Sequence, residues 1–493
     1  MDLTKARQQA EALLKALTRE AYLCGAGLKP ESERAAIYDR FAELTSLTVF
    51  RDLQARAAMA SPPEQRLLAA LLEWLGAVLV EQAAASLLDR VETQEAQARV
   101  RVDGEEMTFR QAEIRLEQSP EPQTRRALQA ARLEVIAACN PLRRDAVERM
   151  HETAWRLGFP HYRALAERLS GLDLTGLEAE GRRFLRETED MYLDLLRWYL
   201  RRALRVHPKE AASHDLAHLF RAPDEDAHFP PGDLVLSAHR CLERMRLDPT
   251  GQGRITLDLE PRPTKSPRAF CAPLDVPREV VLVVAPRGGR EDYTAFFHEL
   301  GHALHFAHTD PELPFELRYL GDQGVTETHA FLLGSLIGNS QWLKYFLKVD
   351  QPESSARLAA FHRLYLARRQ AAKLGYELVL HGAESLQGLE EVYAGALAGA
   401  VRVEWPATLY LADVDPWFYT ARYLRAWWFE AQLEQYLVER YDEEWYRNDR
   451  TGGFLKELWH RGQSRSLEEL GSELGLEALT PDQLIRDLTA RLS

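Results

Sequence analysis

The sequence predicts a mostly α-helical protein with one small β element, placed directly before a helix that is rich in histidine. Apolar residues recur at three- and four-residue spacing through residues 1–205, which is the period of an amphipathic helix. Proline and glycine become frequent in residues 206–290, where two runs resemble strands. Helical spacing then returns and continues to the C-terminus. We therefore expect a helical N-terminal lobe over residues 1–205 and a second region, with the functional site, over residues 206–493.

Two long helices and a hairpin are predicted in the N-terminal part. Residues 63–91 and 124–157 carry alanine, leucine, glutamate and arginine between their apolar positions, which favours helix. Ser61-Pro62-Pro63 breaks the pattern before the first of these helices. The alternating run RVRVDGEEMTF lies within residues 98–109, and its Asp103-Gly104 pair is typical of a two-residue hairpin turn.

The β element and the helix after it are predicted from the middle of the chain. Residues 253–259 and 280–285 are the two strand-like runs. Gly288-Gly289 ends the second run, and Asp292 or Thr294 is of the residue type that caps a helix N-terminus. The following helix has apolar side chains at helical spacing: Tyr293, Phe296, Phe297, Leu300 and Leu304.

Length and composition are those of a globular protein. A chain of 493 residues is expected to form about two to three structural units. Hydrophobic residues make up 46% and charged residues 28%, a balance typical of a soluble protein. The four cysteines are far apart and form no C-x-x-C pair, so the sequence indicates neither a disulfide framework nor a thiolate metal site. Any metal must therefore be held by histidine and carboxylate.

Charge and apolar runs argue against several classes of partner. The net charge of −13, from 75 acidic and 62 basic residues, disfavours nonspecific binding to nucleic acid. The longest uninterrupted apolar runs, such as residues 280–286 and 332–337, are far shorter than the ~20 residues of a membrane span. The N-terminal residues alternate charged and apolar types, without a signal-peptide core. We expect a cytoplasmic monomer or weak homodimer that binds neither nucleic acid nor membrane.

Residues 298–308 read HELGHALHFAH, and the first five match the H-E-x-x-H pattern of zinc peptidases. On a helix His298 and His302 are one turn apart, so their imidazoles point the same way and suit two ligands of one tetrahedral zinc ion. Glu299 is rotated by about 100° from His298, beside the metal rather than on it. A carboxylate there takes a proton from zinc-bound water and returns it to the leaving amine.

The spacing leaves more than one candidate for the third metal ligand. His308 lies six residues after His302, which is the interval of the H-E-x-x-H-x-x-G-x-x-H enzymes. That pattern needs a glycine at which the chain leaves the helix, and here the position is His305. If the helix continues, His308 faces away from the metal, and both later histidines are supporting or surface groups.

The other candidate for the third ligand is Glu327, in GVTETHAFLLGSLIG at residues 324–338. The apolar spacing predicts a helix that begins near Gly324 and Thr326. A carboxylate in its first turn is favoured by the helix dipole, so Glu327 is either a ligand or only a helix-start signal. His329 is a weaker rival for the same role.

Several segments match the pattern of one enzyme family. LDLEPRPTKSPRAFCAPLD, residues 257–275, is similar to D-L-x-x-R-x-x-K-x-x-G-A-F-C, with Arg268 in place of the glycine. HELGHALH is similar to the family's motif letter for letter, and Glu327 follows His302 by 25 residues, the family's interval to its third ligand. PWFYTARYLRAWW, residues 416–428, resembles the F-Y-x-x-x-Y segment. Together these segments resemble the thimet oligopeptidase and oligoendopeptidase F family of zinc metallopeptidases.

The resemblance covers about residues 205–480 and implies a fold and a metal site. It implies a two-lobed, largely helical body with a deep substrate channel, and makes residues 206–493 the zinc-peptidase catalytic region. It also implies that one Zn²⁺ ion is held by His298, His302 and Glu327, with Glu299 as general base. The expected substrates are short unfolded peptides that are cut internally.

The resemblance further implies how a peptide is held. Residues 280–285 would be the edge strand on which the peptide lies as an added strand, through backbone groups that read little of its sequence. The positions expected to contact the peptide are Val281, Val283 and Ala285.

Two tyrosines near the C-terminus match the family, and their surroundings depart from it. Tyr419 and Tyr423 match tyrosines that donate hydrogen bonds to the oxyanion of the tetrahedral intermediate. The family's histidine before the first of them is replaced by Asp413-Val414-Asp415, and Ala421 and Ala426 stand where further family tyrosines would be. The transition-state side of the site is therefore altered, while the zinc side is intact.

Two other functions stay open from the sequence. A related zinc carboxypeptidase or dipeptidase needs a cationic side chain for the terminal carboxylate of its substrate, and Arg422 or Arg425 is a candidate for it. A catalytically weak peptide-binding protein on the same fold is the other. The intact Glu299 argues against that second alternative, and the missing family histidine argues for it.

Overall fold

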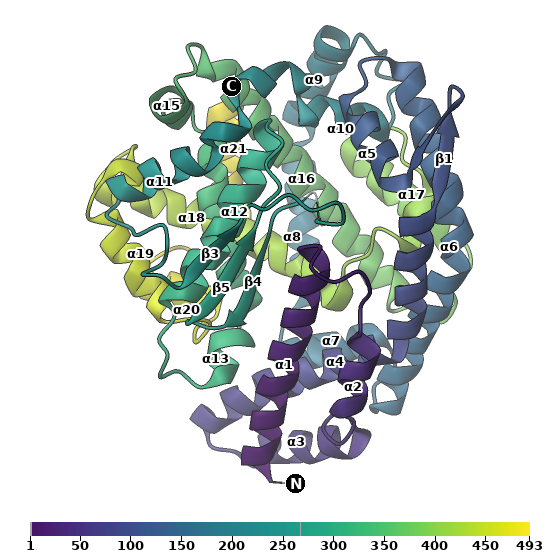
Figure 1. Ribbon diagram of the computed structural model, residues 1–493, viewed down its shortest axis with the longest axis vertical. Helices are drawn as coiled ribbons and strands as arrows, with labels where there is room; N and C mark the ends of the chain where they lie inside the picture. Colours follow the sequence, from purple (N-terminus) through teal and green to yellow (C-terminus); the bar gives the residue numbers. More distant parts are fainter. Residues whose placement is uncertain (1, 267) are drawn as a thin grey trace. The chain divides into compact units, whose positions relative to one another are not determined.

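The computed structural model describes residues 2–266 and 268–493 and is mostly helical, as the sequence predicts (Figure 1). The chain forms two compact units, each assembled from separate stretches of sequence. Unit 1 comprises Met1–Trp74, Asp224–Ala360 and Arg425–Arg491; unit 2 comprises Leu75–Pro223, Phe361–Leu424 and Leu492–Ser493. These units differ from the predicted division at residues 205 and 206, because the first 74 residues belong with the histidine motif.

Unit 1 holds a three-stranded sheet among helices. Its strands are β3 (Ile255–Asp258), β4 (Phe270–Asp275) and β5 (Glu279–Val283). Its helices are α1 (Leu3–Gly25), α2 (Arg34–Arg40), α3 (Leu47–Met59), α11 (Leu234–Arg244), α12 (Arg290–His308), α13 (Phe315–Tyr319), α14 (Gln323–Gly334), α15 (Ser340–Trp342), α19 (Thr451–His460), α20 (Leu467–Leu474) and α21 (Asp482–Leu492).

Unit 2 is built from helices and the predicted hairpin. Its elements are β1 (Arg99–Val102), β2 (Glu105–Thr108), α5 (Phe109–Gln118), α6 (Pro122–Arg156), α7 (Tyr162–Ser170), α8 (Leu174–Glu187), α9 (Glu189–Tyr199), α10 (Ser213–Arg221) and α17 (Leu389–Val401). Four helices contribute residues to both units: α4 (Pro62–Gln97), α16 (Pro352–Leu380), α18 (Tyr419–Tyr441) and, through its last residue, α21.

The hairpin forms where the sequence predicts it. Strands β1 and β2 pair antiparallel, with Val102 opposite Glu105. Asp103 and Gly104 both have positive φ, of 52° and 81°, as the mirror-image turn of a two-residue hairpin requires. The alternating side chains Val100, Val102 and Met107 are buried against α5 and α6.

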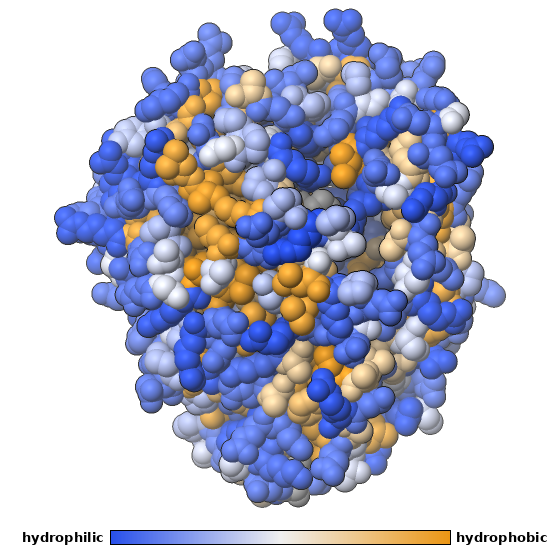
Figure 2. Space-filling view, in the orientation of Figure 1, coloured by the Kyte–Doolittle hydropathy of each residue, from blue (hydrophilic) through white to orange (hydrophobic). Residues whose placement is uncertain are grey.

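Helix α4 is an exception to the prediction that the apolar segments are too short to cross a membrane. Over α4, an 18-residue window has mean hydropathy 1.6, so the helix is long and apolar enough to cross a membrane by length and composition. The helix contains no long uninterrupted apolar run, because a few polar residues interrupt the pattern. In the structure 56% of that window is buried inside the protein, and core helices pass the same test. Most of the molecular face in Figure 2 is hydrophilic, with apolar atoms in smaller patches.

The sheet of unit 1 has the strand order β3-β5-β4 and lies beside α12 (Figure 1). β3 pairs parallel with β5, and β4 pairs antiparallel with it, with Cys271 opposite Leu282. β3 and β5 lie in the predicted runs, whereas the sequence did not predict β4. The prediction that residues 280–285 form an edge strand is wrong, because β5 is the central strand and is paired on both sides.

Candidate metal centre

Helix α12 carries the histidine motif and continues without a break to His308, which excludes a turn at His305. Nδ1–H of His308 donates to the carbonyl of Leu304 at 2.9 Å, as expected when the last turn is helical. The helix begins after Gly289, so neither predicted residue is its N-cap. Asp292 instead accepts hydrogen bonds from the backbone N–H groups of Arg287 and Gly288, at 2.6 and 2.9 Å, and fixes the entry to the helix.

Helix α14 carries Glu327 in its first turn, as predicted. Asp322 caps this helix through a hydrogen bond from the N–H of Gly324 at 2.9 Å. The guanidinium of Arg425 binds both carboxylate oxygens of Asp322, at 3.0 and 2.9 Å, and also binds Glu468. Arg425 is 2% exposed and fully engaged in this role, so it does not offer its charge to a substrate carboxylate.

A glycine inside the motif lets α12 and α14 approach closely. A Cβ atom at Gly301 would lie 2.4 Å from the carbonyl oxygen of His329 and 2.6 Å from Cα of Ala330. Any side chain at this position would therefore push the two helices apart. The glycine of HELGH allows the backbone of the second helix to come near enough for Glu327 to reach the histidines.

The three predicted ligands converge. Nε2 of His298 lies 3.5 Å from Oε2 of Glu327, and Nε2 of His302 lies 3.6 Å from the same oxygen. In the part of the chain that the structure describes, these residues form the one histidine–carboxylate group whose ligand atoms all lie within 4.8 Å of one another. Two ligand atoms on a tetrahedral zinc ion, each about 2.0–2.1 Å from it, are about 3.4 Å apart. The donor set and its spacing thus fit such an ion.

Burial and mutual charge shift the pKa values of these groups strongly. Burial alone would raise the pKa of Glu327, but the positive charge of His302 and hydrogen bonds from both histidines hold that pKa well below its usual range. Burial would lower the pKa of His302, yet the carboxylates of Glu327 and Glu299 raise it. The site therefore favours a cation among its side chains.

Thr326, expected from the sequence only near the start of a helix, contacts one of the predicted ligands. Its Oγ1 lies 2.8 Å from Nδ1 of His302. A metal on Nε2 requires the ring proton on Nδ1, which then donates to this hydroxyl. In the sequence, the position of Thr326 directly before Glu327 could have indicated this contact, because both residues lie on the helix expected to face the histidine motif.

Glu299 lies beside the cluster and is held by the sheet. The backbone N–H of Cys271, on β4, donates to Oε2 of Glu299 at 2.9 Å. The backbone N–H and C=O groups of successive residues in a strand point to opposite edges. Because the N–H of Cys271 binds Glu299, it lies on the edge of β4 that faces away from β5. Pro273 falls on the same edge, where its missing N–H costs no hydrogen bond in the sheet.

The remaining histidines of the two helices lie apart from the cluster. Nε2–H of His305 donates to the carbonyl of Gly462 at 3.2 Å, and burial lowers the pKa of His305 to about 3. His308 packs against Trp459 with ring centroids 5.4 Å apart. His329 packs against His305 at 5.0 Å, and burial holds its pKa well below the usual range. These three side chains are buried core residues, and His308 and His329 lie outside the group formed by His298, His302 and Glu327.

Two of the three residues predicted to bind the substrate backbone are not available for it. Val281 and Val283 belong to the central strand β5, where they pair with β3 on one side and β4 on the other, and both are buried. Ala285 lies beyond the end of the strand. A peptide cannot add to a strand that already has two neighbours, so the expected contacts through Val281 and Val283 are wrong. The contact through Ala285, which is half-buried, stays a prediction.

The two tyrosines lie as the spacing predicts, and the aspartates before them are engaged. Tyr419 and Tyr423 are in the first turns of α18 with ring centroids 4.9 Å apart, and both are half-buried. Asp413 accepts from Arg369 at 2.5 Å and lies 3.3 Å from Nζ of Lys373. The carboxylates that replace the family histidine are thus neutralised inside unit 2. The oxyanion role of the tyrosines stays a prediction.

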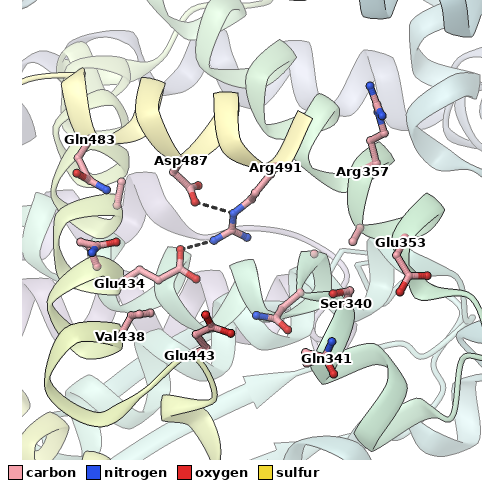
Figure 3. A pocket seen from close by; sticks show the side chains of 15 residues that line it. Ser340, Gln341, Glu353, Arg357, Glu434, Val438, Glu443, Gln483, Asp487 and Arg491 are labelled. Atoms are coloured by element: carbon pink, nitrogen blue, oxygen red, sulfur yellow. Dashed lines mark hydrogen bonds and ion pairs between the residues drawn. The ribbon is translucent and has the colours of Figure 1, made fainter. Parts of the chain in front are cut away.

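A polar cavity of about 550 Å³ lies elsewhere in unit 1, between α16, α18 and α21 (Figure 3). Its walls are rich in carboxylates and amides. Arg491 lies between Asp487 and Glu434 and binds both, at 2.6 and 2.7 Å. None of its lining residues belongs to the histidine–glutamate cluster, so the cavity has no part in that chemistry.

The fold is the helical fold of oligopeptidase structures, which confirms the family resemblance at the level of fold. No family model matches the chain, and no curated protein matches it in sequence. A candidate oligoendopeptidase F from Bacillus anthracis strain Ames is 15% identical, with TM-score 0.65 over 93% of this chain and 85% of that chain. PZ peptidase A, solved with an inhibitor, is 15% identical, with TM-score 0.67 over 93% and 86%. Another candidate oligoendopeptidase F is 16% identical, with TM-score 0.70 over 99% and 95%.

Proposed function

We propose that the protein is a zinc-dependent oligopeptidase that cuts short unfolded peptides internally. The observation that carries the proposal is the convergence of His298, His302 and Glu327, with both Nε2 atoms 3.5–3.6 Å from one carboxylate oxygen. The H-E-x-x-H motif, the neighbouring carboxylate of Glu299 and the likeness to oligopeptidase folds support it.

Zinc bound by these three residues would supply an activated water and polarise the scissile carbonyl. Glu299 would take the proton of that water on a carboxylate oxygen and give it to the nitrogen of the leaving amine. The hydrogen bond from Cys271 fixes Oε2 of Glu299, so Oε1 is the oxygen that faces the proton transfer. Tyr419 and Tyr423 are proposed as hydrogen-bond donors to the oxyanion.

The strand proposed to receive the peptide is β4. It pairs with a single strand, so its other edge carries backbone groups that the sheet does not use. The carbonyl of Cys271 points to that edge, next to the carboxylate that its own N–H binds. A peptide added there would be held by its backbone, with little preference for side chains. Strand addition requires an extended segment, which favours unfolded substrates.

The competing functions differ in what they need from the chain. An exopeptidase needs a cation for a terminal carboxylate, and Arg425 is already bound to Asp322 and Glu468. Arg422, the other candidate, is buried, with 5% of it exposed. A peptide-binding protein without activity would have no use for the carboxylate of Glu299 beside two metal-ligand histidines. We therefore favour the endopeptidase.

The decisive experiment combines metal analysis with peptide digestion. The purified protein should contain one zinc per chain, and it should cut a mixed library of short peptides at internal bonds, as read by mass spectrometry. His302→Ala and Glu327→Ala should remove metal and activity, whereas His308→Ala should retain the metal. A variant pattern in which His308→Ala empties the site and Glu327→Ala does not would overturn the ligand assignment.

A further inference from the structure

A groove of about 460 Å³ in unit 1, separate from the metal cluster, is lined mainly by cations and aromatic rings. Its walls are α11, the π-helical turn at residues 343–347, and the residue that ends this turn. We call it the cationic groove, and its lining residues are Arg240, Glu243, Arg244, Tyr345, Phe346 and Lys348.

The cations gather around one aromatic ring. The guanidinium carbon of Arg244 lies 5.6 Å from the ring centroid of Tyr345, and Nζ of Lys348 lies 5.3 Å from it. Arg447, from the turn at residues 445–447, lies 3.8 Å above the same ring. Lys348 has φ 60°, and this left-handed backbone turns its ammonium back to donate to the carbonyl of Tyr345 at 2.9 Å.

Most of this charge is not compensated by the protein. Arg447 is paired with Glu444, but among the described residues no ion pair involves Arg240, Arg244 or Lys348. Arg240 and Arg244 are four apart on α11, so two like charges face each other across one helical turn, which costs stability. The net charge of the protein is −13, so this group of unpaired cations is opposite in sign to the charge of the whole chain.

Buried hydrogen bonds hold the walls of the groove together. Nε1–H of Trp342 donates to Sγ of Cys241 at 3.4 Å, which joins α15 to the centre of α11. Both residues are fully buried. The cations therefore project from a rigid base, so part of the entropic cost of ordering a binding site is already met.

The cavity in Figure 3 provides a contrast within the same unit. There Arg491 is neutralised by Asp487 and Glu434, so the cavity has no unsatisfied positive charge at this residue. In the cationic groove the arginines keep their planar N–H groups for a ligand, and Glu243 is the one carboxylate among its described lining residues. Charge complementarity therefore selects an anion for the groove.

We infer that the cationic groove is a binding site for a small oligophosphate anion of the pyrophosphate class. Guanidinium groups match phosphate oxygens with two parallel hydrogen bonds, and an ammonium adds a point charge. Because the groove is open to solvent, a single negative charge would be screened, whereas an anion with several charges meets several cations at once. The volume is sufficient for such a ligand and its first hydration shell.

The test is calorimetric titration of the purified full-length protein with sodium pyrophosphate. We expect saturable binding of one anion per chain. Arg244→Gln and Lys348→Gln should each weaken the binding by about tenfold, the loss of one charge-assisted contact. Arg246→Gln is the matched control, because Arg246 lies two residues further along and is paired with Asp449. It removes the same charge and should change the affinity by less than about twofold.

Three results would overturn the inference. An equal loss of affinity in Arg246→Gln would show a response to net charge rather than a site. Loss of binding in His302→Ala, with Arg244→Gln unaffected, would place the anion at the histidine cluster. Binding of an acidic peptide without binding of pyrophosphate would make the groove a protein-docking surface. Retained binding in His302→Ala, together with loss in Arg244→Gln, supports the groove whether or not the protein is a peptidase.

Discussion

The backbone N–H of Cys271 donates a 2.9 Å hydrogen bond to the carboxylate of Glu299, and so joins the edge strand β4 to the general base of the proposed reaction. This contact has a functional consequence. The strand that would receive the peptide and the carboxylate that would move the proton are held in register by one bond. Substrate position and proton transfer are therefore coupled through the backbone of one residue.

The first prediction concerns a substitution that removes this hydrogen bond and leaves the carboxylate of Glu299 unchanged. Cys271→Pro lacks the N–H, and a proline is tolerated at this edge because Pro273 already occupies it. We expect kcat to fall about ten- to a hundredfold, the loss of a hydrogen bond to a charged group, with the zinc content unchanged. Cys271→Ala keeps the N–H and should retain near wild-type turnover. Equal kcat in the two variants would show that the bond does not position Glu299.

The second prediction concerns the close contact between α12 and α14. Gly301→Ala should separate the helices, because its Cβ would overlap the backbone of His329 and Ala330. We expect zinc affinity to fall and the unfolding free energy to drop by roughly 1–3 kcal/mol, the usual cost of overpacking. Gly395→Ala, in α17, is the control, since no atom lies within 4 Å of the added carbon. That variant should bind zinc normally and be unchanged or slightly more stable.

The third prediction tests the group that orients His302. Thr326→Val removes the hydroxyl 2.8 Å from Nδ1 while keeping the shape of the side chain. Loss of such a supporting hydrogen bond typically lowers metal affinity by about 10–100-fold. Thr326→Ser restores the hydroxyl and should restore the affinity, as measured by competition with a zinc chelator. If Thr326→Val bound zinc as tightly as wild type, the hydroxyl would have no orienting role.

The convergence of His298 and His302 was predictable because it depends on helix geometry alone. Two histidines four residues apart share a face whatever the rest of the fold, and the continuation of the helix past His305 followed from the absence of glycine there. Glu327 could be predicted only from the family's 25-residue interval after His302, because local spacing does not show which helix packs against α12. Gly301 permits that approach, but a glycine inside a helix does not by itself reveal what packs against it.

The sheet shows where sequence reasoning fails. β5 reads as a strong strand because Val280 to Val283 are apolar, and a continuous apolar run is typical of a strand buried on both faces. Such a run indicates a central strand, whereas the family resemblance implied an edge strand. The true edge strand β4 contains a proline and alternates buried with half-buried residues. Its weak pattern is what an edge position permits, and this made it hard to recognise.

The fourth prediction concerns the buried carboxyl of Glu377 in unit 2. Burial raises its pKa to about 8, and the carboxylate of Asp415 adds to this, while Lys373 and two hydrogen bonds oppose it. The bonds come from the N–H of Asp415 at 2.8 Å and the hydroxyl of Thr420 at 3.0 Å. The folded protein therefore keeps the proton on Glu377 in a pH range where the unfolded chain has released it.

The sign of the pH effect follows from proton linkage. Between the ordinary value of 4.5 and about 8, Glu377 binds more protons in the folded state than in the unfolded state, so its contribution to the unfolding free energy falls as the pH rises through this window. His381, whose backbone N–H donates to the carbonyl of Glu377, acts inside the window with the opposite sign, because burial holds its pKa well below 6.5. The shifts of Asp413 and Lys373 act outside the window. Asp413, with its pKa lowered by Arg369 and Lys373 against burial, loses its stabilising effect only as the pH falls below the window, and Lys373, with its pKa raised, only above it.

Glu377→Gln cannot ionise, and its unfolding free energy should therefore fall less steeply across the window than that of the wild type. The difference between the two should change by a few kcal/mol, since each unit of pKa shift corresponds to about 1.4 kcal/mol. Urea unfolding at both ends of the window measures the two slopes. Glu384→Gln, at an exposed position just after the same helix, should keep the wild-type slope. If Glu377→Gln and wild type lost stability in parallel, Glu377 would be ionised in the folded protein, and Lys373 would then be its counter-ion.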